Sequence, residues 1–468
     1  MPSMTIPVER SILLVSCYEL GHQPAGIAMP MGLLRGAGYD AETMDVSVEG
    51  FDTDKVKRAA FVGISVPMHT ALRLGLRVAE EIRRLNPRCH VCFYGLYATL
   101  NAEYLLGSVA DSVIGGEFEE ALVQLIKAVL SQAPIEIEDV STRMLASRPV
   151  LARINFTAPN RDTLVPLEHY AKLEHNREQR LVGYVEASRG CLHLCTHCPI
   201  PPVYNGRFFV VPEEVVLEDI RGLVASGARH ITFGDPDFLN GPGHSLRITR
   251  AMHAELPELT FDFTAKVEHI LKHRELIPEF AQTGCIFVVS AVESLSNAVL
   301  ERLDKGHTRA DVIEALRILG AAGIVMRPTF VSFTPWATID DYIDVLEFVE
   351  FHNLIDHVDP VQYSIRLLVP PGSLLLSQPD THQWLGRLVQ ESFSHEWAHP
   401  DPHMDELHKG VVAIVEQAAV GNEDAAETFY TILEFALTLR GDAPATRLGL
   451  PVDPARLRPP RLSEAWFC

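Results

Sequence analysis

The stretch "SRGCLHLCTHC" at residues 188–198 constrains this chain most, because it places three of the eight cysteines within eight positions. Cys191, Cys195 and Cys198 have the spacing C-x3-C-x2-C, and thiolates are ligands for soft metal ions and iron–sulfur clusters. The first residues, "MPSMTIPVER", lack the apolar run of a secretory signal. Clustered cysteines in a reducing compartment favour metal binding over disulfides, so we expect a cytoplasmic metalloprotein.

Three thiolates on one short loop can hold three irons of a [4Fe–4S] cube and leave the fourth iron without a protein ligand. An open position on a metal is where a substrate or cofactor can bind. Two other interpretations stay open at this point. One is a structural zinc site with His197 as the fourth ligand, and the other is three cysteines without a shared role.

The patterns on either side of the cysteines predict an α/β protein with two domains. Residues 11–120 alternate short apolar runs with amphipathic stretches, which is typical of parallel strands joined by crossover helices in a doubly wound domain. From residue 181 the same rhythm resumes, with six expected strands. Six such units would form a partial (β/α)6 barrel with its chemistry at the carboxyl ends of the strands. The cysteines follow the first of these strands.

Four segments are therefore expected. They are a Rossmann-like domain at 1–130, a surface linker at 131–180, the partial barrel at 181–385, and a C-terminal region with two helices and a Pro-rich, Cys-ended tail at 386–468. The last segment also contains a histidine-rich stretch, which is a candidate second metal site or simply a surface loop; its histidines are His395, His399, His403 and His408.

Charge and hydropathy exclude two classes of partner. The net charge of −21, without a Lys/Arg run, argues against nucleic acid, whose phosphates would be repelled. No segment reaches the roughly 18 consecutive apolar residues that a membrane helix needs. We therefore expect an enzyme that acts on a small molecule.

CxxxCxxC after the first strand of a partial barrel resembles the radical S-adenosylmethionine (SAM) superfamily. The resemblance implies that SAM binds the open iron and is cleaved by an electron from the cluster, which itself needs a donor such as flavodoxin or ferredoxin. It also implies that His197 lies beside the adenine ring. The cofactor carries this chemistry, and the protein supplies position and exclusion of water.

Two further motifs extend the resemblance. "FGDPDF" stands where the superfamily holds the SAM amino group, which would use Gly234, Asp235 and Asp237; the alternative is a turn rich in Asp, Pro and Gly. "AVESLSNAVLERLDKGHT" is similar to the fourth-strand segment of the branch that carries an N-terminal cobalamin-type domain. In that segment Glu293 and Ser294 would reach the SAM ribose or carboxylate.

The resemblance also suggests SAM contacts from Lys266 and Glu268 after the third strand and from Arg327 on the fifth, unless these are solvated residues of the barrel end. The N-terminal text looks like a cobalamin-binding domain. Its Asp-x-His-x-x-Gly signature, whose histidine would ligate cobalt, is absent, and "CYELGHQPAG" stands there instead. Members of this branch bind cobalamin without that histidine, so the sequence leaves cobalamin undecided.

The carboxyl end, "LSEAWFC", resembles the start of a tail motif in which radical SAM proteins end near Cys-Cys-Ala-Glu-Pro or Cys-selenocysteine-Ala-Glu-Pro. The sequence stops at the first of those cysteines, Cys468, so we expect the natural chain to continue through a selenocysteine, with Cys468 as a catalytic candidate. The alternative is a terminus that ends in Cys by chance.

Adjacent thiolate and selenolate are soft donors that suit trivalent arsenic. The arsinothricin-forming radical SAM enzymes share an R-x-C-L-x-L-C pattern, present here as Arg189, Cys191, Leu192, Leu194 and Cys195. That resemblance implies transfer of the 3-amino-3-carboxypropyl group of SAM to arsenite. Two other functions stay open: a cobalamin-dependent radical SAM methyltransferase and a non-catalytic metal-binding scaffold.

Overall fold

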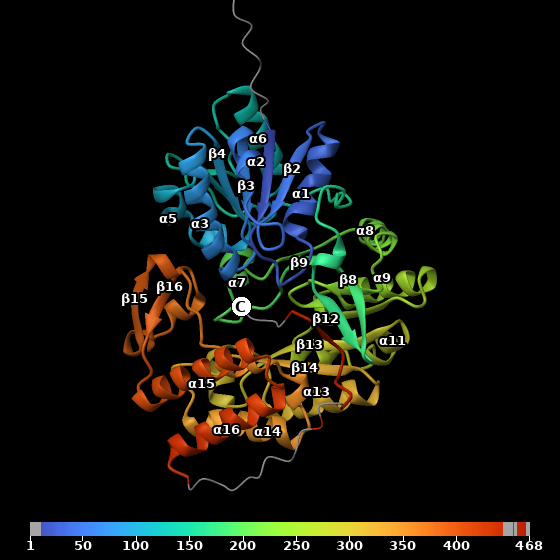
Figure 1. Ribbon diagram of the computed structural model, residues 1–468, viewed down its shortest axis with the longest axis vertical. Helices are drawn as coiled ribbons and strands as arrows, with labels where there is room; N and C mark the ends of the chain where they lie inside the picture. Colours follow the sequence, from blue (N-terminus) through green and yellow to red (C-terminus); the bar gives the residue numbers. More distant parts are fainter. Residues whose placement is uncertain (1–10, 443–452, 454–455, 465–468) are drawn as a thin grey trace, which may run out of the picture.

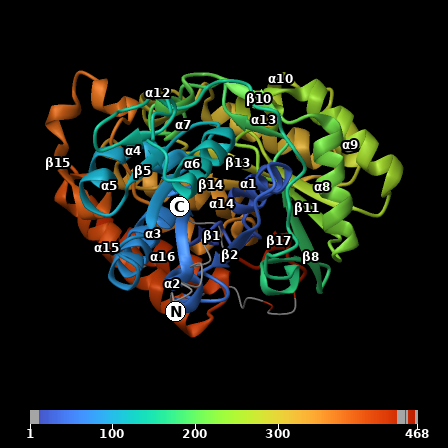
Figure 2. The ribbon, with the colours of Figure 1, turned by 90° about the horizontal axis from the view of Figure 1, so that it is seen from above.

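The computed structural model describes residues 11–442, 453 and 456–464. Two α/β domains follow one another along the chain, the N-terminal one at the top of Figure 1 and the second, with the larger sheet, below it. In the view from above, α8 and α9 lie on one side of the N-terminal sheet and the β15 hairpin lies on the other (Figure 2). The expected fold class, a Rossmann-like domain followed by a partial barrel, is confirmed.

The N-terminal sheet has the order β2-β1-β3-β4-β5-β6, and its first five strands are parallel. Its strands are continuous apolar runs because helices cover both faces, each with its own hydrophobic core. The strands are β1 (Ser11–Ser16), β2 (Ala41–Asp45), β3 (Ala59–Ser65), β4 (His90–Tyr94), β5 (Ser112–Ile114) and the antiparallel β6 (Ser141–Thr142). The helices are α1 (Ala25–Gly36), α2 (Thr53–Arg58), α3 (His69–Leu85), α4 (Leu96–Leu100), α5 (Ala102–Ser108) and α6 (Glu119–Ser131).

The second sheet has the order β14-β13-β12-β11-β8-β7-β17, in which β8 and β11 to β14 are parallel. Its strands are β7 (Lys172–His175), β8 (Glu178–Val185), β11 (His230–Phe233), β12 (Thr260–Thr264), β13 (Cys285–Glu293), β14 (Val325–Phe330) and β17 (Arg461–Leu462). Its helices are α8 (Glu213–Ala225), α9 (Pro242–Glu255), α10 (Val267–Lys272), α11 (Ile277–Gln282), α12 (Asn297–Arg302), α13 (Arg309–Ala321) and α14 (Ile339–Phe351).

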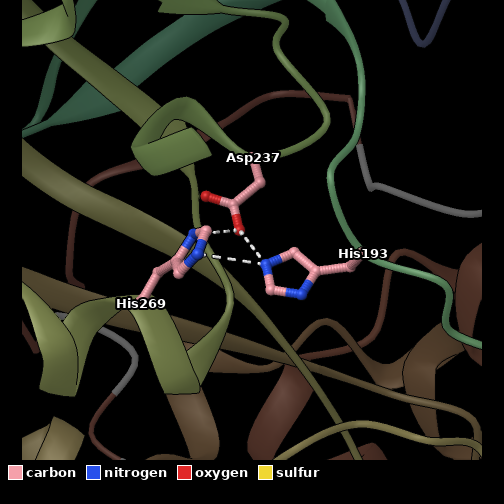
Figure 3. Close-up of side chains that lie close together, drawn as sticks. All are labelled: His193, Asp237 and His269. Atoms are coloured by element: carbon pink, nitrogen blue, oxygen red, sulfur yellow. Dashed lines mark hydrogen bonds and ion pairs between the residues drawn. The ribbon is translucent and has the colours of Figure 1, made fainter. Parts of the chain in front are cut away.

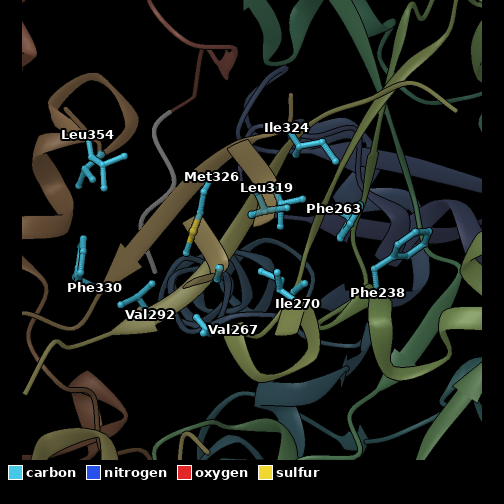
Figure 4. Packing of buried hydrophobic residues seen from close by; sticks show 14 of the residues in the cluster. Phe238, Phe263, Val267, Ile270, Val292, Leu319, Ile324, Met326, Phe330 and Leu354 are labelled. Atoms are coloured by element: carbon cyan, nitrogen blue, oxygen red, sulfur yellow. The ribbon is translucent and has the colours of Figure 1, made fainter. Parts of the chain in front are cut away.

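Aromatic and aliphatic side chains from strands and helices fill the core of this second domain, Phe238 and Phe263 among them (Figure 4). The crossover helices α13 and α14 both begin with a capping box, in which Thr308 or Thr338 exchanges hydrogen bonds with the acid three residues on. Such boxes satisfy the first free N–H groups of a helix and fix where it begins. Because β8 and β11 to β14 are parallel, their carboxyl ends lie at the same edge of the sheet, where the sequence predicts the reactive residues.

Two expectations about the barrel are corrected. The sixth strand, expected around residues 357–369, is replaced by the 3-10 turns η3 (Ile355–His357) and η4 (Pro360–Ser364), and a single bridge joins Phe333 to Arg366. Pro360 has no N–H to give to a strand ladder and starts a turn instead. The expected linker contains β7, which forms a hairpin with β8 through Asn176 and Arg177, both with positive φ.

The C-terminal region contains the two expected helices, α15 (Pro402–Gly421) and α16 (Ala425–Arg440), which pack together against α14 and η4. Before them, β15 (Leu385–Val389) and β16 (Ser394–Trp397) form a hairpin. The remaining short turns are η1 (Leu167–His169), η2 (Phe238–Asn240), η5 (Leu374–Ser377), η6 (Thr381–Gln383) and η7 (Gln390–Ser392). Among the described residues, no helix combines the length and apolar character needed to cross a bilayer.

Candidate functional site

The three cysteines lie in a loop, residues 191–207, that starts beyond the carboxyl end of β8; we call it the cysteine loop. Its two ends are joined by β9 (Ser188–Gly190) and β10 (Phe208–Val210), which pair antiparallel, and it contains the short helix α7 (Ile200–Tyr204). Gly190 has a φ of 75°, and a Cβ there would lie 2.4 Å from the carbonyl oxygen of Arg207. Only glycine can begin this loop, because any side chain would clash with its end.

Asp235 fixes the direction in which the cysteine loop leaves β8. One carboxylate oxygen accepts a hydrogen bond from the backbone N–H of Ala187 at 2.9 Å, and the other accepts from the hydroxyl of Ser188. Burial raises the pKa of Asp235 to about 7, although these donors lower it. Gly234, beside it, leaves room for the ring of Tyr184, whose Oη would lie 2.1 Å from a Cβ. Asp235 thus orients the loop, Gly234 accommodates Tyr184, and the SAM contacts expected of both stay predictions.

The cysteine thiols are held close together away from solvent. Cys191 and Cys195 are buried and Cys198 is half-buried. Burial raises the pKa of Cys191, and burial together with the other two thiols raises the pKa of Cys198 to about 12. Thiols in such surroundings become thiolates only when positive charge is supplied beside them, as a bound metal does.

The thiols are not gathered around one ion in the described structure. One zinc ion about 2.3 Å from each sulfur would bring the sulfurs to about 3.8 Å from one another. Within the described part of the chain, the three cysteines are not a set whose ligand atoms all lie within 4.8 Å of one another. Nε2 of His197, the expected fourth ligand of a zinc site, faces Glu293 at 3.3 Å.

Glu293, Lys305 and His197 form a buried network beside the cysteines. Lys305 Nζ lies 3.1 Å from Glu293 Oε1, and the same oxygen faces His197. Burial raises the pKa of Glu293, but Lys305 and His197 outweigh it and lower the pKa to about 2. Burial alone would lower the pKa of Lys305, but Glu293 and the Cys195 thiol raise it. The site therefore keeps a carboxylate and an ammonium charged beside two of the thiols.

The backbone of Glu293 supports this arrangement. It has a φ of 65°, in the left-handed region, at the end of β13 where the register with β14 shifts. Non-glycine residues pay a conformational penalty there, so the surrounding contacts must hold the side chain in place. Ser294 follows, buried, and its hydroxyl oxygen accepts from the backbone N–H of Ser296 at 3.2 Å.

Asp237 and Lys266 meet two histidines that were not predicted. Asp237 Oδ2 lies 2.8 Å from His269 Nδ1, and His193 Nε2 lies 3.1 Å from His269 Nε2 (Figure 3). Lys266 Nζ lies 3.0 Å from His193 Nδ1 and 3.2 Å from Glu268 Oε2. Burial, Lys266 and His269 lower the pKa of His193 to about 4. These side chains form a second polar cluster against the start of the cysteine loop.

The remaining predicted residues lie apart from these groups. Arg327 is buried on β14 and donates to Asp359 at 3.0 Å. Cys468 lies outside the described residues. The histidine-rich stretch does not gather into one site: His399 contacts the carbonyl oxygen of Ala337, and the His408 ring packs on Phe333.

Sequence reasoning missed the network that joins the two domains at the cysteine loop. Arg189, two residues before Cys191, forms ion pairs with Glu119, with Glu117 at 3.3 Å and with Glu186 at 2.8 Å. Tyr204, at the end of α7, donates to Glu117 at 3.0 Å. The sequence "GGEFEE" places acidic residues just after β5, but nothing in the sequence indicates that they pair with Arg189.

The carboxyl edge of the N-terminal sheet has features of a ligand site. The strand order reverses between β1 and β3, which is where open α/β sheets bind ligands. Glu19 is buried there; its Oε2 accepts from Gly26 N–H at 3.3 Å, and its Oε1 has no hydrogen-bond partner. Burial raises the pKa of Glu19 to about 8. A corrinoid carries amide groups that can donate to such an oxygen, so the edge fits this ligand without a cobalt-ligating histidine.

Comparison with known proteins agrees with this division. Residues 185–349 match the family model of the radical SAM superfamily, and residues 12–126 match the B12 binding domain. The chain is 28% identical over 200 residues to the tRNA-2-methylthio-N(6)-dimethylallyladenosine synthase of Desulfosudis oleivorans, covering 41% of this chain and 42% of the synthase. It is 22% identical to the hopanoid C-3 methylase of Methylococcus capsulatus, covering 70% of this chain and 64% of the methylase.

Among solved structures, the cobalamin-dependent SAM radical enzyme OxsB with aqua-cobalamin bound superposes with a TM-score of 0.71 at 15% identity. The alignment covers 93% of this chain and 74% of OxsB. At that identity the likeness concerns the fold. The chain spans less than two thirds of the length of both curated relatives, so their activities are not carried over here.

Proposed function

Because the chain is a radical SAM enzyme with an N-terminal B12-binding domain, we propose that it transfers a methyl group from SAM to a small molecule with the help of a corrinoid. The observation that carries the proposal is the cysteine loop itself, which is joined by Arg189 to acids at the edge of the N-terminal sheet. A group bound at that edge would lie near the cysteines. A non-catalytic scaffold does not suit this pair of domains.

In this proposal Cys191, Cys195 and Cys198 hold a [4Fe–4S] cluster, which would supply the electron that cleaves SAM. Lys305 keeps positive charge beside the thiolates of Cys195 and Cys198, since its ammonium is within electrostatic reach of both. The buried setting excludes water from the cleavage site. The electron donor we propose is a flavodoxin or a ferredoxin.

SAM would lie against His197, Glu293 and Ser294. The Nδ1 atom of His197 is buried without a hydrogen-bond partner, and the ring can stack on adenine. Glu293 is an acceptor for a ribose hydroxyl or for the SAM ammonium. Lys266 and Glu268 lie at the same end of the barrel. Arg327 on β14 is a more distant candidate for a contact with the SAM carboxylate.

The products of SAM cleavage test this proposal. With anaerobically reconstituted protein, excess reductant and hydroxocobalamin, we expect S-adenosylhomocysteine together with 5′-deoxyadenosine, measured by mass spectrometry, and one cobalt per chain. Glu19→Gln, which removes the carboxylate at the sheet edge, should lower the cobalt content while leaving the iron content unchanged. Persistent lack of cobalt with intact SAM cleavage would contradict the corrinoid role.

A second function is transfer of the 3-amino-3-carboxypropyl group of SAM to trivalent arsenic. It is favoured by the R-x-C-L-x-L-C pattern, in which Leu192 and Leu194 are 47% and 46% exposed and so are not explained by the core. The expected SAM product is then methylthioadenosine, formed only with arsenite present. Arg189 of the pattern already forms ion pairs with Glu117 and Glu119, so its presence is weaker evidence for an arsenic substrate.

A further inference from the structure

Three side chains from three separate elements converge beside the cysteine loop. His193 belongs to the cysteine loop, Asp237 precedes η2 at the end of β11, and His269 lies on α10. Each can offer one ligand atom such that all three atoms lie within 4.8 Å of one another, and within the described residues this is the one such set of His, Cys, Asp and Glu. Two imidazoles and a carboxylate are a ligand combination that zinc and related divalent ions take.

The separations suit one ion. Ligands about 2.0–2.1 Å from a tetrahedral centre lie about 3.3 Å apart. Asp237 Oδ2 lies 2.8 Å from His269 Nδ1 and 3.9 Å from His193 Nε2. These values bracket the expected spacing, so an ion could be bound with small side-chain shifts.

One ligand atom is left without a partner. His269 Nδ1 is buried and makes no hydrogen bond, although Asp237 Oδ2 is only 2.8 Å away, because the two atoms are not aligned for an N–H to donate. The residue is 5% exposed, so water does not compensate. An unpaired buried polar atom costs stability unless a further group satisfies it.

The surrounding charges leave room for a cation. Lys266 is the one ammonium in the cluster, and Glu268 neutralises it at 3.2 Å. Asp237 then remains as an uncompensated carboxylate, 1% exposed. When His193 binds through Nε2, its Nδ1 must carry the proton, so Lys266 Nζ, 3.0 Å from Nδ1, must turn away and let Glu268 Oε2, now 3.8 Å from Nδ1, approach as the acceptor. Carboxylates behind ligating histidines commonly play this part.

We propose that His193, His269 and Asp237 bind a divalent ion of the zinc type, distinct from the cysteine cluster, which ties the cysteine loop to β11 and α10. Three protein ligands leave at least one position open for water or a donor atom of the substrate. The site would fix His193, and with it the backbone between Cys191 and Cys195. The inference does not depend on which group the enzyme transfers.

The experiment uses the full chain with its cluster reconstituted, treated with chelator and then dialysed against excess Zn²⁺. Elemental analysis should find one zinc per chain in addition to the cluster iron. In His269→Gln and in Asp237→Asn, an isosteric change, the apparent Kd for Zn²⁺ should rise by at least about tenfold. The matched control is His403→Gln, which changes an exposed histidine at the start of α15 and should bind zinc like the parent.

Two outcomes would overturn the proposal: no zinc in the parent protein, or equal zinc in the parent and both variants. Circular dichroism of the variants shows whether they fold, and Asp237→Asn decides the matter should His269→Gln not fold. Zinc bound adventitiously by cysteine thiols would disappear in Cys195→Ala and persist in His269→Gln. That pattern would contradict both this site and the occupied cluster, whereas zinc loss in the histidine variants with iron retained supports this site alone.

Discussion

Two buried charge networks border the cysteine loop, and they are built in opposite ways. On the N-terminal side, the single cation Arg189 faces the three carboxylates of Glu117, Glu119 and Glu186, contributed by both domains. On the barrel side, the single cation Lys305 faces one carboxylate, Glu293. The first network therefore carries excess negative charge. The second is balanced, and its ammonium also lies within electrostatic reach of Cys195 and Cys198.

The difference separates two tasks. Buried ion pairs contribute little net stability relative to apolar contacts, but breaking one is costly, so their value lies in fixing geometry. The Arg189 network spans the domain boundary and sets how the N-terminal sheet sits on the loop. The Lys305 network joins the end of β13 to the turn after α12 within the second domain, and sets the electrostatics at Cys195 and Cys198.

The largest effect should come from the loop that both networks border. Cys195→Ala removes one of three cluster ligands, so we expect iron content to fall to near zero and SAM cleavage to be lost, by about 100-fold or more. Cys285→Ala, a buried cysteine on β13 outside the loop, is the matched control and should keep its iron. Iron analysis and SAM cleavage under reductant measure both. Full iron content in Cys195→Ala would show that Cys195 is not a cluster ligand.

The next largest effect should come from Lys305, the cation on the barrel side of the cysteine loop. Lys305→Met leaves Glu293 buried with His197 but without its ammonium partner, which should lower the free energy of unfolding by about 3 kcal/mol. The double variant with Glu293→Gln should recover part of this loss, because no lone charge remains. Denaturant unfolding of the reconstituted protein measures the cycle, and Lys127→Met on the exposed face of α6 is the control. Additive losses in the double variant would show that the two residues do not interact.

Much of this architecture was predictable from local pattern. The parallel strands are apolar runs, the cysteines follow the first barrel strand, and Glu293 lies in a motif that can be recognised alone. The pairing of Arg189 with Glu117 joins residues 72 positions apart, and that of His193 with His269 joins residues 76 apart. No periodicity reports such contacts, since they depend on how the two domains and the strand ends meet.

The wrong prediction of a sixth strand also comes from relying on local sequence pattern. The apolar residues of 357–369 suggested a sixth strand, but Pro360 begins the turn η4, and a single bridge between Phe333 and Arg366 follows it. The histidine-rich stretch left a metal site and a surface loop open, and its histidines lie on β16, before α15 and on α15 itself. The structure gathers histidines that are distant in sequence instead.

The excess negative charge of the N-terminal side predicts a pH dependence. Burial raises the pKa of Glu117 to about 7, with Arg189 opposing and Glu119 adding to the rise. The folded protein thus binds a proton between about pH 4.5 and 7 that the unfolded chain releases, so stability falls as pH rises through this window. Glu117→Gln should remove a part of this fall on the order of 3 kcal/mol and leave the part that comes from Asp235 and Glu19, whose pKa values burial also raises. Unfolding measured from pH 4.5 to 8 tests this, with Glu103→Gln, on the exposed face of α5, as control.

The smallest effect should come from the most exposed member of the same network. Glu186 has a side chain 24% exposed, against 1% for Glu119, so Glu186→Gln should change stability by about 1 kcal/mol or less. Glu186 is one of the charges that raise the pKa of Glu117, so removing it should move the pH transition of Glu117 to lower pH. The same unfolding series measures this shift, and Glu178→Gln, whose partner Arg180 lies outside the network, should leave it unmoved. An unchanged transition in Glu186→Gln would mean that Arg189 already screens the carboxylates from one another, and the N-terminal side would then resemble the balanced Lys305 side.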